Sequence, residues 1–468
     1  MLKLPKLRCH LPLLLALATA ATSLCAQDAA LGTASSEVKP VLPPSDSKAV
    51  PTAQIVLNDG DTVVFLGDSI THQCLYTQYV EDFFYTRFAG KRLHFHNAGI
   101  GGDRAQDAVN RFDEDVAAFK PKLVTVLLGM NDGSYTRYEQ PIFDTYQRGM
   151  NTVLDRIAAI GALAVPMTPT MHDARAARVG GKGSEPRDTY YNGVLALYGA
   201  WLREQAQVRG LGFADLYSPL NRITVAERKK DPAFTMIRDA VHPDAPGQAV
   251  MAVALLEDVL QAPIVSRVSS VVQDGKRTAT AENGELSDVA GTEESVSFTL
   301  KARALPWVLP EPARKGYELT DAATRLNIER LVVGQLASGT YQLAIEGQVI
   351  GSFSDLELAG GVDLAGNDKT PQHQQAGKVA ELNKKRNDEA IRPLRDQWGQ
   401  LKGRSRDVEK ARETNSPQLA EKEAALATFR AEMKLRVDEL IAKGREFEKQ
   451  IYEVAQPVAR KYEIKRVP

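Results

Sequence analysis

Two short segments, far apart in the chain, combine side chains that could carry out acyl transfer. Gly67-Asp68-Ser69 follows the apolar run 62–66, so a serine hydroxyl lies on a tight turn after a predicted strand. Asp239 and His242 place a carboxylate and an imidazole on one turn. A serine hydroxyl is a poor nucleophile unless a base takes its proton, and a carboxylate can orient that base. We therefore expect Ser69 as nucleophile, His242 as base and Asp239 as orienting acid.

Two motifs between the Ser69 turn and the Asp239–His242 pair could instead indicate nucleotide or zinc binding. Gly99-Ile100-Gly101-Gly102 follows a predicted strand, as a nucleotide-binding turn would, but Arg104 stands where that motif needs its third glycine. His94 and His96 alternate as on one face of a strand, and no third zinc ligand is evident. The aspartate–histidine pair could also be a plain helix cap. We favour the catalytic interpretation and expect no cofactor and no metal.

Short apolar runs alternate with amphipathic stretches over the first half of the chain. Strands are expected at 62–66, 93–97, 123–128, 163–167 and 212–214, and helices at 76–88, 105–119, 146–160, 190–207 and 247–260. Strands that alternate with helices predict an α/β fold whose parallel sheet has helices on both faces. Such sheets place their chemistry at the carboxyl ends of the strands, where the Ser69 turn lies.

Four blocks in this region resemble, in order, those of the SGNH (GDSL-type) hydrolases. The blocks are Gly67-Asp68-Ser69, Gly102, Gly129-Met130-Asn131-Asp132 and Asp239-Ala240-Val241-His242, within about residues 55–262. The resemblance implies a flavodoxin-like three-layer α/β/α sandwich and the hydrolysis of ester or related acyl bonds. It also implies an oxyanion hole formed by the backbone N–H groups of Ser69 and Gly102 and the side-chain amide of Asn131.

The remaining segments predict a leader and two further regions. With 468 residues, the chain exceeds one compact domain. Residues 1–26 have the basic and then apolar order of a signal peptide, and residues 27–54 form an Ala-, Ser- and Pro-rich linker. A hydrolase domain at 55–263 is followed by a small β-rich region at 264–370, with strands near 295–300, 326–333, 340–345 and 349–353. Residues 371–468 predict a long helical hairpin, with helices near 372–412 and 418–455.

The composition argues against nucleic acid and membranes as partners. The formal net charge of −1 gives no general attraction to nucleic acid or to an anionic membrane. No stretch beyond the predicted signal approaches the roughly 18 apolar residues of a membrane-spanning helix, so no stable membrane insertion is expected. Two of the three cysteines lie in or beside that signal. The third, Cys74, is interpreted as a small buried apolar side chain, although a thiol nucleophile is an alternative.

An exported catalytic domain with appended regions suits an extracellular polymer as its substrate. We therefore expect a periplasmic or extracellular serine esterase that hydrolyses acyl esters, with acetyl favoured, on a carbohydrate or an acylated small molecule. One alternative is a lipid or thioester acyl hydrolase similar to a lysophospholipase, which would need a long apolar groove. A second alternative is a non-catalytic cell-envelope scaffold that binds partners through its helical hairpin.

Overall fold

The computed structural model describes residues 55–181, 183–185, 187–259 and 263–468, all within one compact unit, Val50–Pro468. The predicted signal peptide, 1–26, and the predicted linker, 27–54, lie outside the described residues. Within the described ranges, no helix has both the length and the apolar character that crossing a bilayer requires.

Four parallel strands form the sheet of the predicted hydrolase domain. They are β1 (Thr62–Gly67), β2 (His94–Gly99), β3 (Leu123–Leu127) and β4 (Leu163–Pro166), in the order β2-β1-β3-β4. β1 and β3 are buried along their whole length, and such continuous apolar runs are typical of parallel strands covered on both faces. Gly67 aligns with Gly99 and with Leu127, so three strands end at the same edge of the sheet.

Helices connect these strands and cover the sheet. They are α1 (Ser69–His72), α2 (Tyr76–Arg87), α3 (Ala105–Asp115), the 3₁₀-helix η1 (Ala117–Phe119), α4 (Gln140–Ala159), α5 (Ala174–Val179), α6 (Arg187–Arg209), α7 (Tyr217–Arg228) and α8 (Ala245–Val259). α2 packs against α8, and α3 packs against α4. The predicted α/β sandwich around a parallel sheet is confirmed.

The domain differs from the sequence prediction in a few elements. The strand expected at 212–214 is reduced to one parallel bridge between Met167 and Ala214. α4 begins at Gln140 instead of residue 146, because Pro141 lies in its first turn, where the missing N–H of proline has no helical partner to lose. The helices α1, α5 and α7 are absent from the prediction.

Two sheets form the β-rich region that follows. One contains β5 (Ile264–Gln273), β6 (Lys276–Glu282), β9 (Ile328–Val333) and β12 (Val362–Asp363) in the order β12-β9-β5-β6. The other contains β7 (Gly284–Gly291), β8 (Ser295–Ala302), β10 (Thr340–Ile345), β11 (Gln348–Ser354) and β13 (Arg460–Arg466) in the order β11-β10-β13-β8-β7. The segments η2 (Glu311–Ala313), α9 (Arg314–Leu319), α10 (Ala322–Leu326) and α11 (Asp355–Gly360) are short helices between the strands.

The four strands predicted in this region are present as β8, β9, β10 and β11. β10 and β11 are joined by Glu346 and Gly347, whose φ angles of 52° and 78° suit a two-residue hairpin turn. The sequence prediction misses β6 and β7, since many of their side chains are exposed. It also misses β5, the two-residue β12, and β13, which follows the last helix and pairs with β8 and β10.

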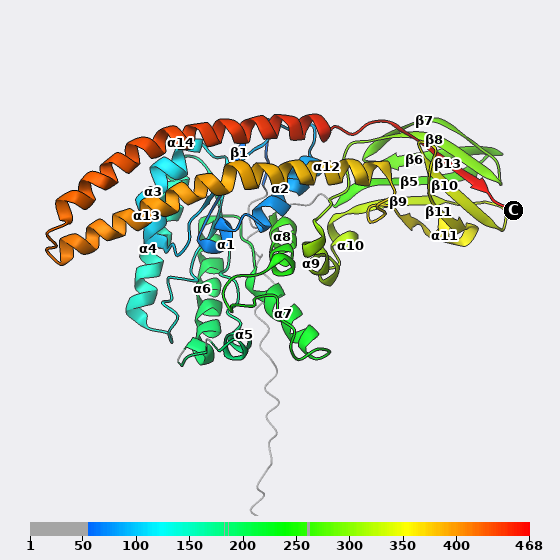
Figure 1. The fold of residues 1–468 in the computed structure, drawn as a ribbon. Helices are drawn as coiled ribbons and strands as arrows, with labels where there is room; N and C mark the ends of the chain where they lie inside the picture. Colours follow the sequence, from blue (N-terminus) through cyan, green and yellow to red (C-terminus); the bar gives the residue numbers. More distant parts are fainter. Residues whose placement is uncertain (1–54, 182, 186, 260–262) are drawn as a thin grey trace, which may run out of the picture. The chain divides into compact units, whose positions relative to one another are not determined.

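The predicted helical hairpin is present after the β-rich region (Figure 1). Its first arm comprises α12 (Pro371–Arg386), a π-helical turn (Asn387–Ile391) and α13 (Arg392–Glu413), and its second arm is α14 (Leu419–Val454). The π-helical turn ends two residues before Pro393, and in a regular helix the ring of this proline would clash with the carbonyl four residues earlier. The wider turn lets the helix continue past the proline.

Buried ion pairs attach the hairpin to the hydrolase domain. Arg395 on α13 contacts both carboxylate oxygens of Asp115, at 2.7 and 2.8 Å, and both side chains are fully buried. Arg386 on α12 contacts Glu81 at 3.2 Å and Glu448 at 3.0 Å. Removing one partner of a buried pair leaves an uncompensated charge in the protein interior. These contacts therefore hold α12 and α13 firmly on α2 and α3.

Candidate active site

Ser69, His242 and Asp239 form one hydrogen-bonded chain of side chains. Ser69 Oγ lies 2.7 Å from His242 Nε2, although the two residues are 173 positions apart in the sequence. His242 Nδ1 lies 2.7 Å from Asp239 Oδ2. If Nδ1–H donates to the carboxylate, then Nε2 is the acceptor for the serine hydroxyl proton. The structure thus brings together the three side chains that the motifs single out.

A tight turn presents Asp239 and His242 to the serine. Asp239 Oδ1 accepts the backbone N–H groups of Val241, at 3.0 Å, and of His242, at 2.8 Å. Ala240 between them has a φ of 75° and is fully buried, and its carbonyl accepts the N–H of Asp173 at 2.9 Å. Partial burial alone would raise the pKa of Asp239, but the hydrogen bonds from His242 and Val241 outweigh it and lower that pKa. The carboxylate is therefore ionised and suited to orient the imidazole.

Ser69 is the first residue of α1, and only Asp68 separates it from the end of β1. Asp68 caps this helix, because its Oδ1 accepts the N–H of Ile70 at 2.9 Å. Backbone N–H groups in the first turn of a helix have no partner within the helix, so Ser69 N–H is available to a ligand. This local geometry follows from an apolar strand that ends in a Gly-Asp-Ser turn.

The other two expected oxyanion donors lie on loops after β2 and β3. Gly102, in the β2–α3 loop (residues 100–104), is exposed and has a φ of 70°, a conformation that favours glycine. Asn131 Nδ2 donates to the carbonyl of Asp103 at 3.0 Å, and Asn131 Oδ1 accepts the Tyr135 hydroxyl at 3.0 Å. These contacts turn the amide nitrogen of Asn131 toward the β2–α3 loop. The sequence motifs do not identify Tyr135 as a site residue. Its role in orienting the Asn131 amide is evident only from this hydrogen bond.

Two buried carboxyl groups flank these donors. Burial, together with the nearby Asp132 and Asp103 carboxyls, raises the pKa of Asp68 to about 7. Burial also raises the pKa of Asp132 to about 7. Asp132 Oδ1 accepts the N–H of Ala105, the first residue of α3, at 2.8 Å. Asp132 therefore braces the loop after β3 against the start of α3.

The histidines considered for zinc contact carboxylates of other elements. His94 Nδ1 lies 2.9 Å from Glu448, and His96 Nε2 lies 3.1 Å from Asp115. Burial lowers the pKa of His96 to about 4, so this imidazole is neutral at pH 7. Among the residues that the structure describes, no group of three or more histidine, cysteine or acidic side chains is arranged to hold a metal ion.

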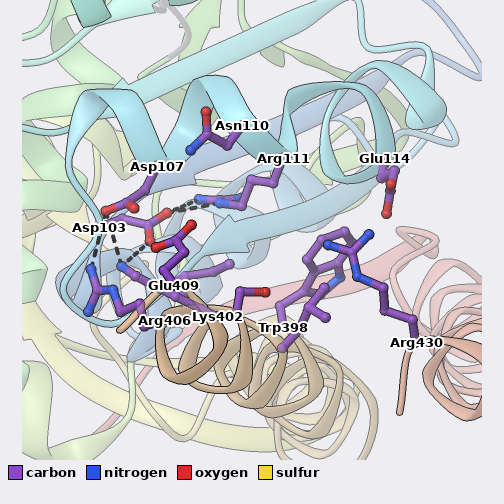
Figure 2. A pocket seen from close by; sticks show the side chains of 13 residues that line it. Asp103, Asp107, Asn110, Arg111, Glu114, Trp398, Lys402, Arg406, Glu409 and Arg430 are labelled. Carbon is purple, nitrogen blue, oxygen red and sulfur yellow. Dashed lines mark hydrogen bonds and ion pairs between the residues drawn. The ribbon is translucent and has the colours of Figure 1, made fainter. Parts of the chain in front are cut away.

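A charged pocket lies beside the β2–α3 loop, between α3 and α13 (Figure 2). Asp103 and Asp107 on one side face Lys402 and Arg406 on the other. Lys402 Nζ lies 2.5 Å from Asp103 Oδ1 and 3.3 Å from Asp107 Oδ2. Sequence reasoning assigned no role to Lys402, which is one of many cations on the predicted hairpin. The structure thus places the C-terminal hairpin against a loop of the candidate active site.

Comparisons with known proteins agree with this architecture. Residues 65–250 match the GDSL-like lipase/acylhydrolase family. An acetylxylan esterase from Geobacillus stearothermophilus is 23% identical over 226 residues, which are 43% of this chain and 95% of that esterase. Residues 65–250 therefore belong to the GDSL-like, or SGNH-type, hydrolases, and the protein is a serine hydrolase that acts on ester bonds.

Two solved structures are also similar to this chain. A gut microbial diltiazem-metabolizing enzyme is 26% identical, with a TM-score of 0.74, and the match covers 89% of this chain and 100% of that chain. This likeness therefore includes regions beyond the hydrolase domain. A crystal structure of an acetylxylan esterase from Geobacillus stearothermophilus is 22% identical, with a TM-score of 0.35, over 44% of this chain and 96% of that chain.

Proposed function

We propose that this protein is an exported esterase that removes acetyl or similar small acyl groups from a carbohydrate. Ser69, His242 and Asp239 are the catalytic triad, and Ser69 N–H, Gly102 N–H and the Asn131 amide form the oxyanion hole. The observation that carries the proposal is the 2.7 Å contact of Ser69 Oγ with His242 Nε2, with Asp239 at 2.7 Å from the other ring nitrogen.

The reaction would proceed through an acyl-enzyme. Ser69 Oγ attacks the ester carbonyl carbon while His242 Nε2 takes the hydroxyl proton, and Asp239 stabilises the imidazolium. The oxyanion of the tetrahedral intermediate accepts hydrogen bonds from the three donors, each worth about 3 kcal/mol in the transition state. The bond to the leaving oxygen then breaks, and His242 protonates the alcohol. Water, activated by the same imidazole, releases the acid and restores Ser69.

The substrate class is inferred from a similar protein and from the predicted leader. The chain matches nearly the full length of an acetylxylan esterase, 95% of it, which favours an acetylated glycan. The predicted signal peptide favours a substrate outside the cytoplasm. The lipid or thioester alternative would need a long apolar groove, whereas the pocket beside the β2–α3 loop is lined mostly by charged side chains. Membership of a hydrolase family favours an enzyme over a non-catalytic scaffold.

Replacement of the candidate nucleophile tests the proposal. In the full-length protein, Ser69→Ala should lower turnover of p-nitrophenyl acetate by at least about 10⁴-fold, since loss of a triad member costs this order of rate. Ser287→Ala on β7, an exposed serine of the β-rich region, is the matched control and should retain full activity. Turnover that is unchanged in Ser69→Ala would contradict the catalytic assignment.

Two substrate series then separate the proposed substrate from its alternative. Activity on p-nitrophenyl esters should fall as the acyl chain grows beyond acetyl, and acetate should be released from acetylated xylan. A rise of activity toward octanoyl esters, without acetate release from the polysaccharide, would favour the lipid alternative.

A further inference from the structure

Both backbone polar groups of Gly101, in the β2–α3 loop, are held by side chains of other elements. Lys402 Nζ, on α13, donates to the carbonyl oxygen of Gly101 at 3.3 Å. On the other side, the N–H of Gly101 donates to His72 Nδ1, on α1, at 3.3 Å. Gly101 and Gly102 are both exposed, and glycines have more backbone freedom than other residues. These two contacts therefore restrain a segment that would otherwise be mobile.

The contact with Lys402 acts on the peptide that carries the proposed oxyanion donor. The carbonyl of Gly101 and the N–H of Gly102 belong to the same planar trans peptide, so they point in opposite directions. Holding the carbonyl toward α13 consequently fixes the direction of Gly102 N–H, on the opposite side of the peptide. The ammonium group also polarises the peptide, and hydrogen bonds that share one peptide strengthen one another.

A buried network keeps Lys402 in this position. Asp103, whose side chain is fully buried, accepts from Lys402 through Oδ1 and from Arg111 Nε through Oδ2 at 2.8 Å (Figure 2). Arg111 also donates to the carbonyls of Gly67 at 3.3 Å and Ala98 at 2.7 Å, near the ends of β1 and β2. The cation of α13 is thus connected, through two side chains, to the strand ends that position the candidate site.

Packing along one face of α13 brings Lys402 to the loop. Ile100, at the start of the β2–α3 loop, packs in one cluster with Leu394, Trp398 and Leu401. These positions repeat every three or four residues and so lie on one side of the helix. Arg395, near the first of them, is anchored to Asp115. Lys402 follows two turns later and reaches the loop because the helix is already fixed on α3.

We infer that Lys402 is a positioning residue of the esterase, which orients and polarises the Gly101–Gly102 peptide for stabilisation of the oxyanion. The inference rests on the proposed function, in which Gly102 N–H is an oxyanion donor. It makes the C-terminal hairpin a part of the catalytic unit, because one of its side chains completes the geometry of the active site.

The test compares variants of the full-length protein that differ in the hydrogen-bond donor and the charge that residue 402 presents to the Gly101 carbonyl. Lys402→Met keeps an unbranched side chain but removes the donor and the charge. Its kcat on p-nitrophenyl acetate should fall about 10- to 100-fold, less than the roughly 10²–10³-fold loss when a donor is removed outright. The KM should stay within about twofold, because the contact matters most when the oxyanion forms.

A tetrahedral adduct gives a readout that a general loss of structure would not produce. Phenylboronic acid forms a tetrahedral boronate on a reactive serine, and its Ki should rise in Lys402→Met by a factor similar to the fall in kcat. Active enzyme is counted by fluorophosphonate titration, so a smaller folded fraction cannot imitate the effect. Arg406→Met is the matched control on the same helix, since Arg406 contacts Asp107 at 3.5 Å and is expected to leave kcat and Ki within about twofold.

Conservative variants decide the outcome if Lys402→Met does not fold. Lys402→Arg keeps the charge and the donors and should recover most of the activity, whereas Lys402→Gln keeps a donor without the charge and should be intermediate. Equal kcat and Ki in the wild type and in either Lys402→Met or Lys402→Gln would overturn the inference. If these variants are normal while Ser69→Ala is inactive, the inference about Lys402 fails and the proposed function stands. An active Ser69→Ala would instead remove the proposed function.

Discussion

Asp68, directly before the candidate nucleophile, carries a carboxyl group that is 1% exposed. Its pKa is about 7 in the folded protein, compared with 3.8 for an unperturbed aspartate, mainly because burial disfavours the charged form. The folded protein thus keeps this proton over a pH range in which the unfolded chain has lost it. The contribution of Asp68 to stability is therefore full below about pH 4 and falls as the pH rises toward 7.

Asp68→Asn should remove this dependence on pH. An asparagine oxygen can still accept the N–H of Ile70, and an amide does not titrate. The free energy of unfolding of Asp68→Asn, relative to the wild type, should increase by on the order of 3–4 kcal/mol between pH 4 and pH 8. Urea denaturation across this range measures the difference. Asp144→Asn, at a partly exposed position on α4, is the control, and a difference that stays constant for Asp68→Asn would contradict the assignment.

At the scale of secondary-structure elements, α13 connects the C-terminal hairpin to the candidate active site. Its sequence reads as a charged solvated helix, and most of its surface is indeed polar. Arg395 is nevertheless fully buried against Asp115, which also contacts Arg111 and His96. Burial alone would raise the pKa of Asp115, but the cations and the hydrogen bond from His96 hold it below the usual range. The helix is therefore docked through a charge network as well as through apolar packing.

Arg395→Met should destabilise the protein far more than loss of an exposed ion pair. It leaves the buried Asp115 without its bidentate partner, which should cost about 3–5 kcal/mol in the free energy of unfolding. Arg412→Met on the same helix breaks an exposed pair with Glu423 and should cost at most about 1 kcal/mol. Equilibrium urea denaturation distinguishes the two variants, and equal losses would contradict a role of the Arg395 pair in docking α13.

At the scale of the whole compact unit, the hydrolase domain shares its core with the C-terminal helices. Val379 of α12 and Ile451 and Tyr452 of α14 belong to the same buried apolar cluster as the strands of the parallel sheet. The Tyr452 hydroxyl also donates to the carbonyl of Leu93 at 2.8 Å. The predicted boundary at residue 263 therefore separates segments that bury one another.

Residues 55–263 expressed alone should not form a stable esterase. Without α12, α13 and α14, Glu81 loses Arg386 and Asp115 loses Arg395, and apolar surface of the domain is exposed to water. We expect no cooperative thermal unfolding transition and little ester hydrolysis, compared with residues 55–468 as control. A cooperative transition together with activity near that of the longer chain would show that the predicted domain is independent.

The sequence by itself determined the main elements of the hydrolase domain and of the hairpin, and the local chemistry of the candidate site. An apolar strand ending in Gly67-Asp68-Ser69, and the turn that holds Asp239 and His242, depend on interactions between residues a few positions apart. The same holds for the strand–helix alternation and for the amphipathic pattern of the hairpin, since periodicity records which side of each element is buried. The α/β fold was therefore predictable, and so were the side chains that lie together at the candidate site.

Only the tertiary structure decided which distant segments meet. Lys402 contacts Gly101 across 301 positions, and Arg395 contacts Asp115 across 280. The pairing of β13 between β8 and β10 also joins segments that are far apart in the sequence. α13 carries many lysines and arginines, and no local pattern distinguishes the two that reach buried carboxylates from those that face water. That choice depends on how the packed helices are aligned, which is a property of the assembled fold.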